Sequence, residues 1–300
     1  MTPMNRSVFM LSLALSLSSY AFQACSQKAN TNKTKETASA TSATDKTFPY
    51  QLDKGQPTEL PDELQEISGI TFLPDNKEWI YAIQDEKGLL YSYNLINKQL
   101  SSVPFEKDGD YEDLAVSNSH FIILKSNGTL YTFPITEKNN IQQVKTFKDL
   151  LPKGEYEGLA TDPVHQLVFA LCKSCSADKK KAQTSGYIFK INETGDLEAN
   201  GGFTLNINQL KQFDSSFSKT FKPSALTKRV TTNEWYILSS VDKALVITDD
   251  KWNVKSVSPL SRKQHAQPEG IAFDADDNLY ISNEAGNKDK AILYKFELLK

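Results

Sequence analysis

A motif of two alternating apolar runs joined by a polar turn recurs five times along the chain, and this repeat constrains the fold more than any other feature. The last copy, residues 267–284, reads QPEGIAFDADDNLYISNE. Alternation at period two is typical of half-buried strands, and a turn rich in Asp and Asn between two such runs predicts a β-hairpin. The other copies begin at residues 67, 111, 156 and 223.

The spacing of the copies predicts the architecture. The five motifs align on a column of mostly small residues, namely Gly69, Asp113, Gly158, Ala225 and Gly270. The position just before it is held by Ser68, Glu112, Glu157, Ser224 and Glu269, at successive intervals of 44, 45, 67 and 45 residues. A period of about 45 residues with short strands is typical of β-propeller blades. We therefore predict an all-β fold, a five-bladed β-propeller over residues 48–300.

The remaining strands of each blade can be placed in the same way. A third apolar segment follows each hairpin, at residues 89–95, 129–135, 186–192, 244–250 and 291–298. The last blade has no room for a fourth strand because the chain stops at Lys300, so we expect a strand near residues 48–56 to complete it and to join the two ends of the ring. A six-bladed ring is the alternative, since the longest interval could hold a degenerate blade. Residues 207–221, where Leu210, Phe213 and Phe217 have helical spacing, indicate a short helix in that interval instead.

The acidic members of the repeated column predict a metal site. The first strand of each propeller blade lines the axis, so Glu112, Glu157 and Glu269 should converge there. Three neighbouring carboxylates must share protons, bind a cation or remain hydrated. Oxygen donors in a loose ring favour Ca2+, whereas zinc is disfavoured because no His or Cys joins the column. The alternative is that these side chains satisfy neighbouring backbone amides.

A possible second ring flanks the first. It comprises residues next to the first strands and at the ends of the second strands of several blades, namely Glu66, Ser68, Asp85, Glu86, Ser224 and Glu284. The alternative is that these residues only stabilise turns.

The first 47 residues predict export and anchoring. Arg6, a Ser-laced apolar run and the sequence FQAC at residues 22–25 indicate a lipoprotein-type signal peptide over residues 1–25, with Cys25 lipidated. An ordinary signal peptide cut near Ala24 is the alternative. Residues 26–47 are polar and lack apolar periodicity, which predicts a flexible tether. We therefore expect a protein anchored by its lipid to a membrane of the bacterial cell envelope, periplasmic or surface-facing.

The motifs also resemble a known family. ELQEISGITF, YEDLA, YEGLA and QPEGIAFDADDNLYISNE are similar to the SdiA-regulated family of bacterial envelope proteins, which are related to NHL-repeat propellers, and the resemblance covers residues 60–300. The resemblance implies a five-bladed propeller with a bound calcium ion. The biochemical role of the family is not established. The family tends to carry acids after the second strand of the middle blades, where this chain has Lys125 and Cys172-Lys173.

Two of the three cysteines form the sequence Cys172-Lys-Ser-Cys175. The pair follows a predicted strand, whereas a redox-active pair would be expected to open a helix beside a sheet. A structural zinc would need two further ligands. A local disulfide, or two plain thiols, is the favoured interpretation.

Composition and motifs exclude some classes of function but do not identify an activity. A net charge of −3 and the lack of a basic stripe argue against a nucleic-acid partner. The favoured hypothesis is a monomeric, calcium-containing propeller that binds an unknown small-molecule or protein ligand. The alternative is a calcium-dependent hydrolase of esterase, lactonase or phosphoesterase type, for which His265 and Asp85 are candidate bases outside the column.

Overall fold

The computed structural model describes residues 48–217 and 220–299. The described residues all belong to one compact unit, whose internal contacts set its bounds at Thr47–Lys300. The predicted signal peptide, Cys25 and the tether lie outside the described residues. Within residues 48–217 and 220–299, no helix combines the length and apolar character needed to cross a membrane.

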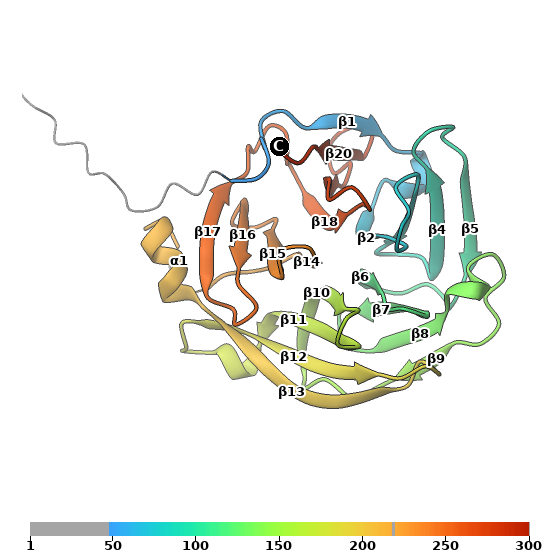
Figure 1. Ribbon diagram of the computed structural model, residues 1–300, viewed down its shortest axis with the longest axis horizontal. Helices are drawn as coiled ribbons and strands as arrows, with labels where there is room; N and C mark the ends of the chain where they lie inside the picture. The colour runs from blue at the N-terminus through green and yellow to red at the C-terminus, as the bar shows by residue number, and fades with distance from the viewer. Residues whose placement is uncertain (1–47, 218–219, 300) are drawn as a thin grey trace, which may run out of the picture. The chain divides into compact units, whose positions relative to one another are not determined.

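Five four-stranded antiparallel sheets surround a central axis, which confirms the predicted five-bladed propeller (Figure 1). From the axis outward, blade 1 contains β2 (Ile67–Phe72), β3 (Trp79–Gln84), β4 (Leu89–Asn94) and β5 (Leu100–Pro104), and blade 2 contains β6 (Tyr111–Val116), β7 (His120–Lys125), β8 (Leu130–Pro134) and β9 (Lys145–Phe147). Blade 3 contains β10 (Gly154–Asp162), β11 (Leu167–Cys175), β12 (Gln183–Ile191) and β13 (Leu197–Asn206). Blade 4 contains β14 (Ala225–Arg229), β15 (Glu234–Ser239), β16 (Ala244–Thr248) and β17 (Val254–Pro259), and blade 5 contains β18 (Pro268–Phe273), β19 (Leu279–Asn283), β20 (Ile292–Phe296) and β1 (Gln56–Glu59).

The five inner strands contact one another around the axis, and β18 contacts β2 to close the circle. The small residues of the repeated motif allow this close approach. A Cβ added at Gly69 would lie 2.6 Å from the Cα of Asp113 on the next inner strand, and one added at Gly270 would lie 2.4 Å from the carbonyl oxygen of Ser68. Only glycine fits at these two positions without moving a neighbouring backbone.

The apolar core lies between blades. Each buried cluster draws side chains from two neighbouring blades, because the sheets pack face to face around the ring. Blades 3 and 4, for example, share a stack in which the ring centroids of Phe203 and Trp252 are 3.6 Å apart and those of Trp235 and Trp252 are 4.7 Å apart. Burial of such large aromatic faces supplies much of the driving force for packing the blades.

The helix predicted within residues 207–221 is present but shorter, as α1 (Ile207–Phe213), so Phe217 lies beyond its end. The described residues contain no sixth sheet. The Asn206 side chain accepts a hydrogen bond from the backbone N–H of Asn208 at 2.9 Å and caps the first turn. Leu210 is fully buried in the cluster between blades 3 and 4. The long interval between the third and fourth motifs therefore holds a longer outer hairpin and this helix.

The ring closes through the N-terminal part of the propeller, as predicted, but the closing strand begins later than expected. β1 pairs antiparallel with β20, from Gln56 opposite Lys295 to Glu59 opposite Ile292. The predicted strand near residues 48–56 is wrong in position. Tyr50 is instead buried between blades 4 and 5, and a turn closed by a 3.0 Å bond from Lys54 N to Gln51 O separates it from β1.

Candidate functional site

The three glutamates of the repeated column occupy equivalent β-bulges at the start of their inner strands. In each case the residues before and after the glutamate pair with consecutive residues of the second strand, so the glutamate itself has no pairing partner in that strand. The pairs are Tyr111–Lys125 and Asp113–Leu124 in blade 2, Tyr156–Cys172 and Gly158–Leu171 in blade 3, and Pro268–Asn283 and Gly270–Ser282 in blade 5. A bulge bends the strand and re-aims the extra side chain. Glu112, Glu157 and Glu269 therefore lie at the same end of the axis, which we call the acidic end.

Backbone hydrogen bonds between blades hold this end together. The Tyr111 N–H of blade 2 donates to Asp85 O of blade 1 at 3.0 Å, and the Tyr156 N–H of blade 3 donates to Ser126 O of blade 2 at 2.9 Å. The Ala285 N–H of blade 5 donates to Gln65 O of blade 1 at 2.8 Å. The end of one second strand is thereby fixed beside the start of the next inner strand, and side chains from the two sequence-predicted rings become neighbours.

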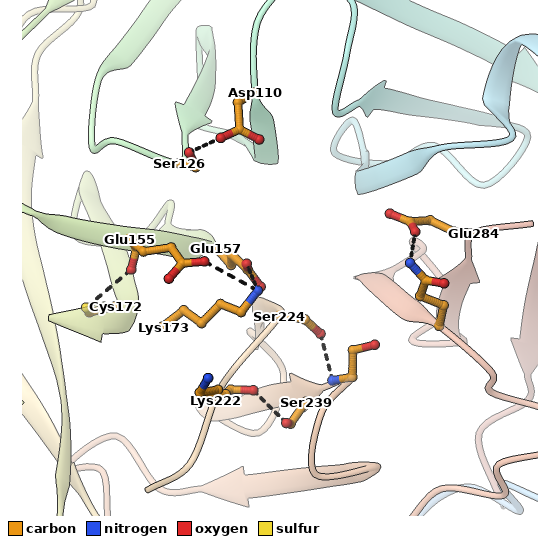
Figure 2. Close-up of polar contacts among 12 residues, drawn as sticks. Asp110, Ser126, Glu155, Glu157, Cys172, Lys173, Lys222, Ser224, Ser239 and Glu284 are labelled. Atoms are coloured by element: carbon orange, nitrogen blue, oxygen red, sulfur yellow. Dashed lines mark hydrogen bonds and ion pairs between the residues drawn. The ribbon is translucent and has the colours of Figure 1, made fainter. Parts of the chain in front are cut away.

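Lys173 supplies a positive charge inside the ring of acids, and the sequence did not predict this role. Its ammonium group donates to the carboxylate of Glu157 and lies 3.7 Å from a carboxylate oxygen of Glu155 (Figure 2). The Glu157 side chain is 7% exposed and that of Lys173 is 24% exposed, so the pair is largely shielded from water. The disulfide between Cys172 and Cys175 brackets Lys173, and both cysteines are buried.

Burial and mutual repulsion raise the pKa values of the acids at this end. Burial, reinforced by the charge of Glu157, raises the pKa of Glu112 to about 9. Burial also raises the pKa of Glu157 to about 7, although the hydrogen bond from Lys173 acts in the opposite direction. Burial and the charge of Glu157 raise the pKa of Glu269 to about 7, and burial together with Glu269 raises the pKa of Glu284 to about 8. The folded protein thus holds a set of carboxyl groups that are poorly compensated when ionised.

Asp85 has a buried carboxyl group whose hydrogen bonding is incomplete. Its Oδ1 atom is buried and has no hydrogen-bond partner among the described residues. Burial, assisted by the charge of Glu66, raises the pKa of Asp85 to about 6. Its backbone N–H donates to Glu66 O of blade 1 at 3.2 Å and its carbonyl accepts from Tyr111 N of blade 2 at 3.0 Å, so Asp85 lies where these two blades meet. An unpaired buried carboxylate oxygen is costly unless a proton or cation joins it.

The other members of the predicted second ring have more varied surroundings. Glu284 accepts a hydrogen bond from Gln267 and faces the Glu157 side of the ring in Figure 2, whereas Glu86 is exposed. The Ser224 hydroxyl donates to Pro268 O at 2.9 Å and accepts from Ser240 N at 3.2 Å. Ser68 is buried, and its carbonyl accepts from the Ser282 hydroxyl at 3.3 Å. The two serines of the column therefore join neighbouring blades.

Asp113, which the sequence placed only in the small-residue column, is a buried carboxyl beside the ring. It is 2% exposed, its Oδ1 accepts from Leu114 N at 2.8 Å, and its Oδ2 accepts from Leu159 N of blade 3 at 2.7 Å. Burial raises the pKa of Asp113 well above its usual range. An acid at a position that is otherwise Gly or Ala was the available signal for this role.

His265 does not overhang the axis as a base would. Its ring is fully buried against Tyr294 and Phe296, at centroid distances of 5.2 and 5.9 Å, and Nδ1 is 3.3 Å from the Asn283 amide. Burial lowers the pKa of His265 to about 4. His265 was a candidate base outside the column, but this burial in blade 5 argues against that role.

Solved structures share the architecture at low sequence identity. Glutaminyl cyclase from Myxococcus xanthus matches with a TM-score of 0.57 and 11% identity, over 82% of this chain and 96% of that chain. A PQQ-bound aldose sugar dehydrogenase from Streptomyces coelicolor matches with a TM-score of 0.50 and 11% identity, over 82% of this chain and 99% of that chain. These likenesses show the fold alone. No curated protein matches the sequence.

A protein-family model matches the part of the chain that forms the five blades. The model described as SdiA-regulated covers residues 40–296, which include all five inner strands, the three bulged glutamates and the closing strand β1. The sequence motifs and the five-bladed ring agree with this match. The chain belongs to the SdiA-regulated family.

Proposed function

We propose that this protein is a ligand- or partner-binding propeller of the bacterial cell envelope that takes a calcium ion at its acidic end. The observation that carries the proposal is the convergence of Glu112, Glu157 and Glu269, each on an equivalent bulge and each with a raised pKa. A divalent cation would offset the repulsion that raises these values.

The donor chemistry fits calcium. Carboxylate oxygens and water in a flexible arrangement suit Ca2+ better than Mg2+, which requires near-octahedral geometry. Asp85 Oδ1, buried and without a partner among the described residues, is a further oxygen donor near Glu112. Glu112, Glu157 and Glu269 would hold the ion, with Asp85 and Glu284 beside them.

The ion must compete with Lys173. Across residues 48–217 and 220–299, no three His, Cys, Asp or Glu side chains are grouped closely enough to hold a metal as they stand. Glu157 is paired with Lys173, so binding requires Glu157 to exchange the ammonium group for the ion. When bound, calcium supplies a positive centre that can attract an oxygen atom of a ligand.

Calcium binding is tested by thermal unfolding with calcium, magnesium or chelator. An ion that binds only the folded state stabilises it by about 2.7 kcal/mol at a hundredfold excess over its dissociation constant. We expect calcium to raise the melting temperature above that in chelator, with magnesium less effective. Glu157→Gln should weaken the response, while Glu193→Gln, at an exposed position of the β12–β13 turn, should not. Identical melts with calcium and chelator, with no copurifying metal, would refute the site.

A calcium-dependent hydrolase is the second candidate. It is favoured by the pKa values of Glu157 and Glu269, both raised by burial to about 7, where a carboxylate is an effective general base. A panel of chromogenic esters, lactones and phosphoesters, assayed with calcium and with chelator, separates the two functions. Turnover that depends on calcium and is lost in Glu269→Gln would establish catalysis.

The envelope anchor has its own test, since Cys25 lies outside the described residues. Cys25→Ala should leave the protein unprocessed or release it from the membrane fraction, because the thioether-linked lipid would be missing. Unchanged membrane partition of this variant would contradict a lipid anchor at Cys25.

A further inference from the structure

A pocket lined by six lysines opens beside the acidic end. Its volume is about 680 Å3, and the lysines that line it are Lys173, Lys179, Lys180, Lys181, Lys211 and Lys222. They come from separate segments: the end of β11, the connection to β12, helix α1 and the approach to β14. We call this the lysine pocket. Apart from Lys173, these lysines lie outside every residue column that the repeat defines.

The positive charge of the lysine pocket is largely uncompensated. Among the ion pairs of the described residues, only Lys173 of these six lysines takes part, through Glu155 and Glu157. The other five contribute their charges to one concave surface. This concentration is notable in a chain whose 34 Lys and Arg are outnumbered by 37 Asp and Glu.

The single acid in the lining is occupied elsewhere. The Asp178 carboxylate accepts from the Ser185 N–H at 2.9 Å, from the Ser185 hydroxyl at 2.6 Å and from the Gln183 amide at 3.1 Å. These bonds tie the connection to β12 and occupy three of the about four lone-pair positions of the carboxylate. One carboxylate can offset only one of the lysine charges, so the pocket keeps an excess of positive charge for an external anion.

The walls of the pocket are built from fixed elements. The lining includes Cys175, which is bridged to Cys172, and Phe221, which is 2% exposed. The buried Thr184 hydroxyl donates to Phe221 O at 3.1 Å and fastens β12 to the segment before β14. A lining that combines such apolar side chains with several cations suits a ligand with an organic body and several anionic groups.

We propose that the lysine pocket binds a small organic anion bearing two or more phosphate or carboxylate groups. A cleft that holds charges of one sign focuses the field and concentrates ions of the opposite sign. An extended polyanion such as a nucleic acid fits poorly, because it would also lie over Glu155 and the acidic end. The same anionic chemistry is available from a free metabolite or from a lipid headgroup.

The proposal goes beyond the calcium site and is tested with that site empty. Pyrophosphate is titrated calorimetrically into the protein in low salt with chelator present, so that no calcium contributes to binding. The test variant is the double substitution Lys211→Gln and Lys222→Gln. The control variant, Lys54→Gln and Lys190→Gln, removes the same charge from two exposed positions outside the pocket.

We expect pyrophosphate to bind the wild type, the affinity to fall at least tenfold in the test variant and to change less than twofold in the control. The affinity should also fall as salt is added. Equal losses of affinity in the two variants would mean that net charge alone explains the binding of pyrophosphate, and would refute the proposed site in the lysine pocket. Lack of binding to the wild type would overturn it as well.

A vesicle arm distinguishes the two sources of the anion. The protein is sedimented with vesicles that contain cardiolipin, whose headgroup bears two phosphates, or with vesicles of phosphatidylcholine alone. Retention by the cardiolipin vesicles only, competed by pyrophosphate and lost in the test variant, assigns the anion to a lipid headgroup. Pyrophosphate binding without vesicle retention assigns it to a soluble compound. Vesicle retention that neither pyrophosphate nor the test variant reduces, with no pyrophosphate binding, contradicts the proposal.

Discussion

Lys173→Met should destabilise the protein at pH 8.5 but hardly at pH 5.5. Glu157 has a pKa raised by burial above that of a free glutamate, to about 7, so the folded state binds this proton more tightly than the unfolded state. The stability linked to this proton is complete below the unfolded-state pKa and is lost as the pH rises through the folded-state value. The ammonium group of Lys173 limits that loss, because it compensates the ionised carboxylate. Without Lys173, ionisation of Glu157 costs more.

The size of the effect follows from the exposure of the pair. Removing one partner of a fully buried ion pair costs about 3–5 kcal/mol, and a hydrogen bond to a charged group contributes about 1.5–3 kcal/mol. Because the Lys173 side chain is 24% exposed while that of Glu157 is 7% exposed, we expect the lower range, about 2 kcal/mol at pH 8.5. For a domain of this size that corresponds to a decrease in melting temperature of about 4–8 °C.

The assay is thermal unfolding at both pH values in chelator, with Lys125→Met as the matched control. Lys125 ends the second strand of blade 2, where it pairs with Tyr111 as Cys172 pairs with Tyr156 in blade 3, so it lies one position before the equivalent of Lys173; it lies over the Tyr111 ring at 5.3 Å and takes part in none of the ion pairs of the described residues. The control should show no additional loss at high pH. Calcium should then raise the melting temperature of Lys173→Met more than that of the wild type, because the ion no longer competes with the ammonium group.

The reasoning fails if Lys173→Met loses the same stability at pH 5.5 and 8.5. A loss independent of pH would mean that the aliphatic stem of Lys173, rather than its charge, stabilises the fold. A control variant with the same pH dependence would also refute the specific pairing with Glu157.

Two further predictions concern the fold around the site. Asp113→Asn should cost less in urea unfolding than Asp113→Ala, because the amide oxygen can still accept from one of the two backbone N–H groups, whereas Ala leaves both the Leu114 and Leu159 N–H groups without acceptors, at about 1–3 kcal/mol each; equal losses in the two variants would contradict this. Deleting residues 48–60 should abolish cooperative unfolding, since it removes β1 from the edge of β20, while deleting residues 26–45 should leave the melt unchanged; a chain starting at Leu60 that melts like the full protein would show that closure is dispensable.

The sequence by itself determined the number of blades and the convergence of the acids. Period-two alternation depends only on which side chains face the sheet core, so each hairpin could be recognised locally. The repetition then determined which residues converge, because equivalent positions in successive blades are related by rotation about one axis. Glu112, Glu157 and Glu269 therefore had to meet at one end, and the structure adds that a bulge aims each of them.

Only the tertiary structure decided what the acids contact and where the chain closes. Lys173 reaches Glu157 from the second strand, β1 begins at Gln56 because Tyr50 fills the space between blades 4 and 5, and His265 turns into the core of blade 5. The lysine pocket likewise joins Lys179, Lys211 and Lys222 from separate segments that belong to no repeat. Such contacts depend on loop lengths and on the angle at which neighbouring blades pack, and neither leaves a periodic signal in the local sequence.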